Sequence, residues 1–317
     1  MNNIKVFVSS RSFSSNNYLK KILLSKYPNT IFNNTGRKLT QNEFISFARD
    51  ADKVIVALDR IDKKVLKQLP NLKLISKYGV GLDNINLRDL EKYNIKLGWS
   101  QGQNARSVAE LTIGYIFSIS RNLFEYQYLM KDKFIFNQII SNQVSNKKIG
   151  IIGFGSIGSE LAKLLSPFKC KIYFNDIRKI KPKSSLQSQK SLNFILKNCD
   201  IISIHTPLTS RSKNLINRKN INLCKKNTLI INCARGGIID ENAIYSFLKK
   251  NKFANAAFDV FIDEPPKKNK LLNLENFYCS PHIGGSTNQS IINMGLSAIS
   301  CLDKNIDYKK LYKFGYE

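Results

Sequence analysis

A glycine-rich loop near the middle of the chain does most to restrict the folds open to it. Residues 148–168 read KIGIIGFGSIGSELAKLLSPF, so the pattern G-x-G-x-x-G follows a short apolar run and opens a stretch of helical period. This order of strand, glycine turn and helix is typical of a βαβ unit, whose strands lie parallel. Parallel sheets are covered by helices on both faces, so the loop favours an α/β fold.

The rest of the chain agrees with this reading, because short runs rich in Val, Ile and Phe alternate with helical stretches. Five such runs precede residue 101, and six more lie between residues 147 and 280. Between the two series, residues 104–130 contain no Pro and a single Gly, and they predict one long helix buried between domains. We expect two Rossmann- or flavodoxin-like parallel-sheet domains, one made of residues 1–98 and 288–317, with the other, residues 99–287, inserted into it.

Each position of the glycine-rich loop has a mechanical role. Gly153 makes the tight turn, Gly155 lets the backbone approach a pyrophosphate, and Gly158 lets helix and strand pack closely. Ser156 and Ile157 open the helix, whose free N–H groups and partial positive charge suit phosphate oxygens. The loop therefore predicts a dinucleotide site in residues 99–287. A structural glycine turn without a ligand is the alternative.

An acidic residue in the right place indicates which dinucleotide is bound. Asp176 ends the next apolar run, 18 residues after Gly158. A carboxylate there accepts hydrogen bonds from the adenosine ribose and repels a 2′-phosphate, which favours NAD over NADP. Arg178 follows two residues later and tempers that preference.

Three chemically active residues follow the later strand-like runs. Arg235 comes after TLIINCA, Glu264 follows AAFDVF, and His282 follows FYCS. Ligands of parallel sheets bind beyond the carboxyl ends of strands, so all three fall on the same edge as the glycine-rich loop. His is a proton acceptor near neutral pH, a carboxylate orients its ring, and Arg binds a carboxylate or polarises a keto oxygen. Each residue alone has an ordinary explanation: Arg235 as a solvated charge, Glu264 as a polar loop residue and His282 as a residue at the start of a helix. Because all three lie on one edge, we predict hydride transfer coupled to proton transfer.

Composition narrows the classes of binding partner, metal site and cellular location that remain possible. The 50 Lys and Arg against 23 Asp and Glu give a net charge of +27, which raises nucleic acid, anionic membranes and anionic substrates as partners. The positive residues are scattered over helical faces and turns, so a solvated surface is favoured, with neither nucleic acid nor membrane as partner. The six cysteines form no CxxC pair, and no metal site is expected. Free thiols and the absence of a long apolar segment favour a cytoplasmic location.

Several long stretches resemble the NAD-dependent D-2-hydroxyacid dehydrogenases, in particular their phosphoglycerate dehydrogenase-like group. They occur in the family's order and span most of the chain: ISKYGVGLDNIN (75–86), NARSVAELT (104–112), GFGSIG (153–158), HTPLTSRSKNLIN (205–217), INCARGGIIDENA (231–243), AAFDVFIDEPP (256–266) and PHIGGST (281–287). The resemblance implies an NAD-dependent oxidoreductase that acts as a homodimer, with residues 99–287 binding NAD and the other domain binding substrate.

The resemblance also implies roles for individual residues. The catalytic residues are Arg235, which also orients substrate, Glu264, which is paired with the base, and His282, the general acid/base. The substrate is expected at Lys77, Tyr78, Gly79, Val80, Gly81 and Asn104, with the loop amides holding its carboxylate. Besides the loop and Asp176, the cofactor is expected at His205, Thr206, Pro207, Cys233, Ala234, Asp259, Gly284 and Gly285. The resemblance places Asp259 close to the nicotinamide. For His205, its position on the same strand edge and the turn at Thr206-Pro207 predict a wall beside the cofactor.

The substrate is expected to be a small anionic 2-hydroxy or 2-oxo acid. The basic surface favours 3-phosphoglycerate and hence serine biosynthesis, with Arg60 or Lys77 meeting the phosphate. Glyoxylate, hydroxypyruvate and D-lactate are alternatives within the family, and an NAD-sensing corepressor is an alternative outside catalysis. Two positions depart from the family's usual pattern: Trp99-Ser100-Gln101 replaces a segment like Asn-Thr-Pro, and Lys77 stands where an Arg is common.

Overall fold

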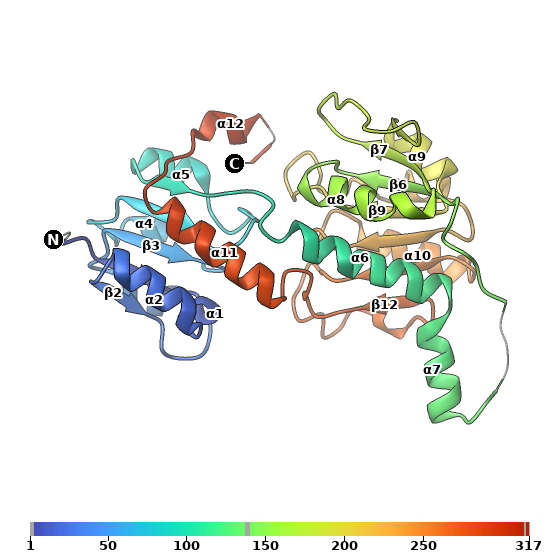
Figure 1. Cartoon of the computed structure of the whole chain (residues 1–317), viewed down its shortest axis with the longest axis horizontal. Coiled ribbons are helices and arrows are strands. Elements are labelled where there is room, and N and C mark those ends of the chain that lie inside the picture. Colours follow the sequence, from blue (N-terminus) through green and yellow to red (C-terminus); the bar gives the residue numbers. More distant parts are fainter. Residues whose placement is uncertain (1–2, 137–139, 314, 317) are drawn as a thin grey trace. The chain divides into compact units, whose positions relative to one another are not determined.

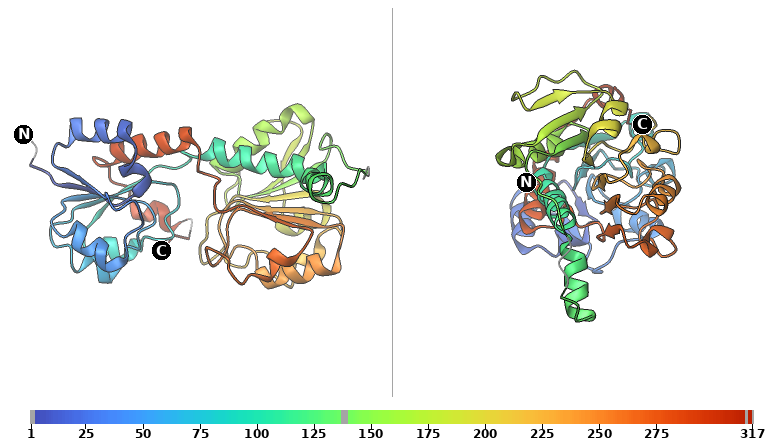
Figure 2. Two further views of the ribbon diagram at one scale, coloured as in Figure 1. Left: turned by 90° about the horizontal axis from the view of Figure 1, so that it is seen from below. Right: turned by 90° about the vertical axis from the view of Figure 1, so that its right-hand side faces the viewer.

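The computed structural model describes residues 3–136, 140–313 and 315–316. They form two compact units, which are described separately below (Figure 1). Unit 1 is Met1–Asn104 with Ser286–Glu317, and unit 2 is Ala105–Gly285. Each unit holds one parallel sheet with helices on both faces (Figure 2). The expected pair of parallel-sheet α/β domains is therefore confirmed.

Unit 1 is built on five parallel strands in the order β2-β1-β3-β4-β5, the flavodoxin-like order. The strands are β1 (Val6–Val8), β2 (Thr30–Phe32), β3 (Lys53–Val56), β4 (Leu74–Lys77) and β5 (Lys96–Gly98). The helices are α1 (Arg11–Ser14), α2 (Asn17–Lys26), α3 (Gln41–Ala48), α4 (Lys63–Leu66), α5 (Leu87–Lys92), α11 (Asn288–Cys301) and α12 (Tyr308–Tyr312).

The apolar runs of unit 1 are continuous because the strands are covered on both sides. In β3, Val54 and Val56 pack with α3, α4 and α5, whereas Ile55 packs with α2 and α11. Helix α11 reaches this sheet from the far end of the sequence, and Ser76 of β4 donates a 2.7 Å hydrogen bond to the carbonyl of Ala298.

Unit 2 has seven parallel strands in the order β12-β11-β10-β9-β6-β7-β8, which contains the Rossmann arrangement. The strands are β6 (Lys148–Ile152), β7 (Lys171–Asn175), β8 (Gln187–Gln189), β9 (Ile201–Ile204), β10 (Leu229–Asn232), β11 (Asn255–Phe258) and β12 (Phe277–Cys279). The helices are α6 (Ala105–Ser120), α7 (Leu123–Asp132), α8 (Ser156–Leu164), α9 (Leu192–Asn198) and α10 (Glu241–Lys250), with 3-10 turns at Ser166–Phe168, Ile221–Leu223 and Lys270–Asn273. Helices α6 and α8 cover one face, and α9 and α10 cover the other.

Two expectations about secondary structure were wrong. Residues 104–130 are two helices, because Asn122 adopts a left-handed backbone (φ +53°) that cannot continue a right-handed helix. The second of them, α7, buries none of its residues. Strand β8 was missed, because its sequence QSQ is polar and it pairs only at the edge of the sheet.

The compact units also differ slightly from the expected boundaries. Residues 99–104 and 286–287 group with unit 1, whereas the sequence placed them with residues 105–285. Trp99 is buried in the core of unit 1, and Thr287 caps the first turn of α11 through the N–H of Ser290. No helix in the described part of the chain is long and apolar enough to cross a membrane. All six cysteines are free thiols, and all but Cys279 are buried.

Candidate active site

The sheet of unit 2 brings the predicted residues to one edge. Since all seven strands are parallel, their carboxyl ends lie together. Gly153 follows β6, Asp176 follows β7, His205 follows β9, Cys233 to Arg235 follow β10, Asp259 follows β11 and His282 follows β12. The fold thus lines up one set of side chains suited to a dinucleotide and another suited to proton transfer.

His282 and Glu264 form a direct pair. The Nδ1 atom of His282 lies 2.8 Å from Oε2 of Glu264, and the other carboxylate oxygen accepts a 3.1 Å hydrogen bond from the backbone N–H of Phe261. A carboxylate accepts hydrogen bonds, so Nδ1 carries a proton, and Nε2 is the ring nitrogen left to exchange a proton with a substrate. The pair therefore fixes both the orientation and the tautomer of the imidazole.

Asp259 holds the loop that carries His282. Its buried carboxylate accepts hydrogen bonds from the hydroxyl of Ser280 (2.5 Å) and from the backbone N–H groups of Ile283 and Gly284 (2.8 Å each). These contacts lie on both sides of His282, whose φ is +56°. Asp259 was predicted to lie near the nicotinamide; the structure shows that its carboxylate positions the His282 loop.

Arg235 sits in a turn that Asn232 shapes. The side-chain oxygen of Asn232 accepts a hydrogen bond from Ala234 N–H (3.1 Å), and its amide donates to the carbonyl of Arg235 (2.9 Å). The half-buried guanidinium of Arg235 donates to the carbonyl of Ala234 (2.7 Å). Next to them, burial raises the pKa of Cys233 to about 12, so this thiol stays neutral.

The glycine-rich loop has the shape that a bound dinucleotide needs. A Cβ atom at Gly153 (φ +89°) would lie 2.6 Å from the carbonyl carbon of His205, and one at Gly158 would lie 2.2 Å from the carbonyl oxygen of Gly153. At Gly155, by contrast, the nearest neighbour of such an atom would be Arg178 Nη2 at 3.9 Å, so the backbone is open there. No described side chain caps α8, and its first N–H groups remain for a pyrophosphate. The residues present therefore fit NAD.

His205 is a buried neutral side chain. Burial lowers its pKa to about 3, and its Nε2 lies 2.7 Å from the hydroxyl of Ser203. Its Nδ1 is buried without a hydrogen-bond partner among the described residues. After it, Thr206 is half-buried, and the carbonyl of Pro207 accepts a 2.5 Å hydrogen bond from Ser212. A neutral ring suits the wall role predicted for His205 and does not suit an acid/base.

The predicted substrate loop lies in unit 1, after β4. Among the described residues, none accepts a hydrogen bond from the backbone N–H of Val80 or Gly81. Tyr78 is buried against Phe13, and Gly79 has a φ of +117°. The loop can therefore offer two neighbouring amides to an anionic group, which is the role predicted for it.

The side chain of Lys77, at the end of β4, is hydrogen-bonded within unit 1. Its side chain is buried, and the ammonium group donates to the carbonyl of Ala57 and to Oδ1 of Asn84 (2.6 Å). Lys77 therefore ties the loop after β4 to the end of β3, and this position does not present its charge to a ligand. Asn104 ends unit 1, and its side-chain oxygen is buried without a partner in the described part of the chain.

Trp99, which departs from the family's usual pattern, contacts the predicted substrate loop. Its indole N–H donates a 3.1 Å hydrogen bond to the carbonyl of Val80, and its ring is buried beside Tyr316. The departure from the family's usual segment thus fixes the backbone of the loop.

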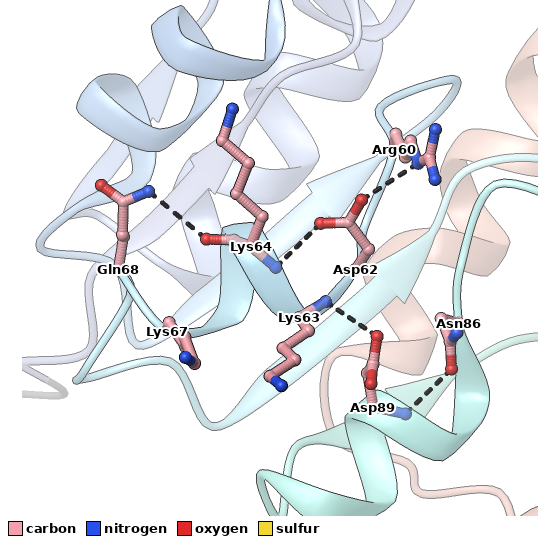
Figure 3. A pocket seen from close by; sticks show the side chains of 8 residues that line it. All are labelled: Arg60, Asp62, Lys63, Lys64, Lys67, Gln68, Asn86 and Asp89. Carbon is pink, nitrogen blue, oxygen red and sulfur yellow. Dashed lines mark hydrogen bonds and ion pairs between the residues drawn. The ribbon is translucent and has the colours of Figure 1, made fainter.

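A basic hollow of about 640 Å³ lies beside α4 in unit 1 (Figure 3). Arg60, Lys63 and Lys64 line it, but Arg60 pairs with Asp62 at 3.0 Å. The ammonium groups of Lys63 and Lys64 point to different sides in Figure 3. The cations do not converge, so the hollow gives no specific support to a substrate phosphate at Arg60.

One positioning residue could not be found from the sequence. Glu241, in the first turn of α10, accepts hydrogen bonds from the backbone N–H of Ile262 (2.9 Å) and from the side chain of Asn269 (2.7 Å). It therefore holds both ends of the loop that carries Glu264. In the described residues, no three His, Cys, Asp or Glu side chains gather as a metal site would require.

The chain has clear relatives among known proteins. Residues 113–284 match the family model described as D-isomer specific 2-hydroxyacid dehydrogenase, NAD binding domain. The chain is 35% identical over 260 residues to D-3-phosphoglycerate dehydrogenase of Methanocaldococcus jannaschii, a match that covers 80% of this chain and 49% of that protein. It thus spans about half the length of that relative.

Two further relatives match over most of their length. The hydroxypyruvate reductase of Thermotoga maritima is 33% identical over 278 residues, which is 86% of this chain and 90% of that protein. The crystal structure of D-lactate dehydrogenase from Aquifex aeolicus, complexed with NAD and lactic acid, has a TM-score of 0.80 and 26% identity, covering 97% of this chain and 95% of that one. The names of these relatives refer to different substrates.

Proposed function

Because the chain belongs to the D-isomer specific 2-hydroxyacid dehydrogenase family, whose NAD-binding domain it contains, we propose that it interconverts a D-2-hydroxy acid and a 2-oxo acid. The observation that carries this proposal is the 2.8 Å contact of Glu264 with His282 Nδ1 on the strand edge that also holds the dinucleotide loop. An oriented imidazole on the same sheet edge as such a loop matches the needs of hydride transfer coupled to proton transfer.

The residues divide the chemistry as follows. NAD, when bound, accepts or supplies the hydride. In the oxidation of the hydroxy acid, Nε2 of His282 takes the hydroxyl proton, and Glu264 keeps the ring in the competent tautomer. Arg235 binds the carboxylate or polarises the keto oxygen through its planar guanidinium, and the amides of Val80 and Gly81 bind the carboxylate. In the reverse direction His282 returns the proton to the alkoxide oxygen.

We further propose 3-phosphoglycerate and 3-phosphohydroxypyruvate as the substrate pair, which would place the protein in serine biosynthesis. The net charge of +27 supports an anionic substrate, and the relative in Methanocaldococcus jannaschii bears the name of that activity. Hydroxypyruvate, glyoxylate and lactate are the alternatives, since the relatives' names include a hydroxypyruvate reductase, a glyoxylate reductase and a D-lactate dehydrogenase.

A panel of 2-oxo acids tests this proposal. Purified protein is incubated with NADH and, in turn, 3-phosphohydroxypyruvate, hydroxypyruvate, glyoxylate, pyruvate and 2-oxoglutarate, and NADH consumption is followed. The highest kcat/KM is expected with the phosphorylated acid. A higher value with another acid would keep the reaction and overturn the substrate. Tight NADH binding without turnover of any acid would favour a sensor in place of an enzyme.

We also propose a cytoplasmic homodimer, in which α7 contributes to the contact between copies. Leu123, Phe124, Tyr128 and Met130 of α7 are between 44% and 53% exposed, and large apolar groups on one helix favour association. Sedimentation equilibrium should give twice the chain mass, and Leu123→Glu should lower the dimer's stability. Phe253→Glu, at an 84% exposed apolar position outside α7, is the matched control. A monomeric wild-type protein would overturn the proposal.

A further inference from the structure

We propose that Arg178 allows this chain to take NADPH as well as NADH, because it neutralises the ribose-binding carboxylate of Asp176 and offers a guanidinium to a 2′-phosphate. The inference rests on the proposed use of a nicotinamide dinucleotide. It goes beyond that function by naming the residue that sets the choice between the two cofactors, a choice that Asp176 alone would decide in favour of NADH.

Asp176 is fully engaged in the structure. Its Oδ1 accepts hydrogen bonds from the backbone N–H and the Nε of Arg178, both at 2.9 Å. Its Oδ2 accepts from the Nη2 of Arg178 at 3.0 Å and from the backbone N–H of Phe154 at 2.9 Å. An ionised carboxylate has about four lone-pair sites, so four donors saturate it. A ribose hydroxyl must therefore displace part of the Arg178 fork before Asp176 can accept from it.

The ion pair also changes the electrostatics of the site. Burial raises the pKa of Asp176, but the hydrogen bonds from Arg178 and Phe154 outweigh burial and hold that pKa below its usual value. The carboxylate therefore stays ionised, and its charge is cancelled at close range by a guanidinium. Repulsion of a 2′-phosphate, the usual physical basis for rejecting NADPH, is correspondingly weakened.

Arg178 lies where a phosphate next to the ribose would meet it. Its Nη2 is 3.9 Å from the position of a Cβ atom on Gly155, the open glycine of the dinucleotide loop, and 3.5 Å from the carbonyl of Phe154. A guanidinium binds phosphate through two parallel N–H groups, a geometry that a Lys cannot provide. The side chain thus lies next to the open backbone of the dinucleotide loop, where the adenosine end of the cofactor would bind.

The two members of the pair differ in their freedom to move. The side chain of Asp176 is 7% exposed, whereas that of Arg178 is 46% exposed. Their backbone is fixed by Gln189, whose amide donates to the carbonyls of Asp176 (3.1 Å) and Arg178 (2.7 Å). The guanidinium can therefore turn from the carboxylate to a phosphate while the loop keeps its shape, and Asp176 remains in place for the ribose of NADH.

Binding measurements on the full chain test the proposal without relying on turnover. Dissociation constants for NADH and NADPH are measured by calorimetry for the wild type, Arg178→Ala and Arg178→Lys. Lys181→Ala is the matched control, because it removes one exposed positive charge from the same loop without touching Asp176. Circular dichroism checks that each variant is folded.

The wild type is expected to bind NADPH within about tenfold of NADH, and Arg178→Ala to weaken NADPH binding at least about tenfold while NADH binding is unchanged or tighter. Arg178→Lys should lie between the two, because it keeps the charge and loses the fork. Three results would overturn the inference: rejection of NADPH by a wild type that binds NADH, an unchanged preference in Arg178→Ala, or an equal shift in Lys181→Ala. Each of these would leave the proposed function standing, whereas failure to bind either dinucleotide would overturn both.

Discussion

The backbone of His282 lies in the left-handed region, with φ at +56°. This conformation costs a non-glycine residue about 1–2 kcal/mol, so neighbouring contacts must hold it. Asp259 supplies them through Ser280 and the N–H groups of Ile283 and Gly284. The strand ends in the sequence were enough to predict that Arg235, Glu264 and His282 share one edge. They could not predict that Asp259 binds backbone, because this depends on two loops 24 residues apart meeting in space.

Asp259→Asn should therefore damage the His282 loop. The Asn side chain keeps one acceptor oxygen, but its NH₂ group would face a backbone N–H of Ile283 or Gly284, which needs an acceptor. The free energy of unfolding should fall by about 1–3 kcal/mol, and kcat should fall with it. Urea unfolding and NADH oxidation measure the two effects, and the exposed Asp263→Asn serves as control. Unchanged stability and turnover would show that Asp259 does not position the loop.

Glu264 should matter to turnover far more than its neighbour Asp263. The two carboxylate oxygens of Glu264 accept hydrogen bonds from His282 Nδ1 and from Phe261 N–H. Glu264→Gln preserves the shape of the side chain but replaces one of these acceptor oxygens with a donor. The ring then loses its fixed tautomer, and kcat should fall by at least about tenfold, since general acid–base catalysis contributes about 10²–10⁴-fold. The neighbouring Asp263→Asn removes the same charge and should leave kcat unchanged. Equal effects of both variants would mean that only charge matters here.

Among the helices and strands, the sequence predicted those that a short-range pattern of apolar residues or glycines determines. The apolar runs and the glycine-rich loop correspond to β6, α8 and the other buried strands, since both faces of each strand are covered. The break between α6 and α7 was missed, because Arg121-Asn122 carries no Pro or Gly and Asn tolerates the left-handed backbone. Strand β8 was missed because pairing with β7, not hydrophobicity, defines it.

Two glycines in helices should respond in opposite ways to alanine. A Cβ atom at Gly114 in α6 would meet no atom within 4 Å, so Gly114→Ala should raise the free energy of unfolding by about 0.5–1 kcal/mol. At Gly158 the new Cβ would lie 2.2 Å from the Gly153 carbonyl oxygen, so Gly158→Ala should lower that free energy by about 1–3 kcal/mol and weaken NADH binding. Thermal unfolding and NADH titration measure both. Tolerance of alanine at Gly158 would contradict the close packing of loop and helix.

At the scale of the whole molecule, unit 1 is assembled from both ends of the chain. Asp303, just after α11, contacts Lys26 at 2.6 Å, Tyr27 at 2.5 Å and Lys53 at 3.1 Å. The N–H of Ile306 donates to the carbonyl of Leu97 at 2.9 Å. These contacts join residues more than 200 positions apart. The sequence therefore predicted that the C-terminal segment returns to the first domain, but it could not predict which side chains hold that segment in place.

The Asp303 cluster predicts a pH dependence of stability. Burial raises the pKa of Asp303, but its hydrogen bonds to Lys26, Tyr27 and Lys53 outweigh burial and hold that pKa well below its ordinary value of 3.8. A carboxyl group whose pKa is lower in the folded than in the unfolded chain stabilises the fold at pH values above its unfolded-state pKa. This stabilisation is lost as the pH falls through the folded-state pKa. Asp303→Asn should therefore be less stable than wild type above about pH 5, by about 0.5–1 kcal/mol after solvent screening.

This difference should shrink as the pH falls below about 4, where the unfolded carboxyl is protonated. Urea unfolding of both proteins between about pH 3 and pH 8 measures it, with the exposed Asp50→Asn as control. A difference that stays constant into the acid range would show that the charge of Asp303 does not secure the returning segment.

In the proposed reaction His282 moves the proton, while the glycine-rich loop binds the dinucleotide independently of it. The most direct test compares wild type with His282→Gln, measuring NADH affinity by titration and kcat with the best 2-oxo acid of the panel. NADH affinity should stay within about twofold, because the imidazole is held by Glu264 and the loop of residues 153–158 keeps its own backbone shape, and kcat should fall by about 10²–10⁴-fold. Turnover that survives the substitution would show that His282 does not move the proton.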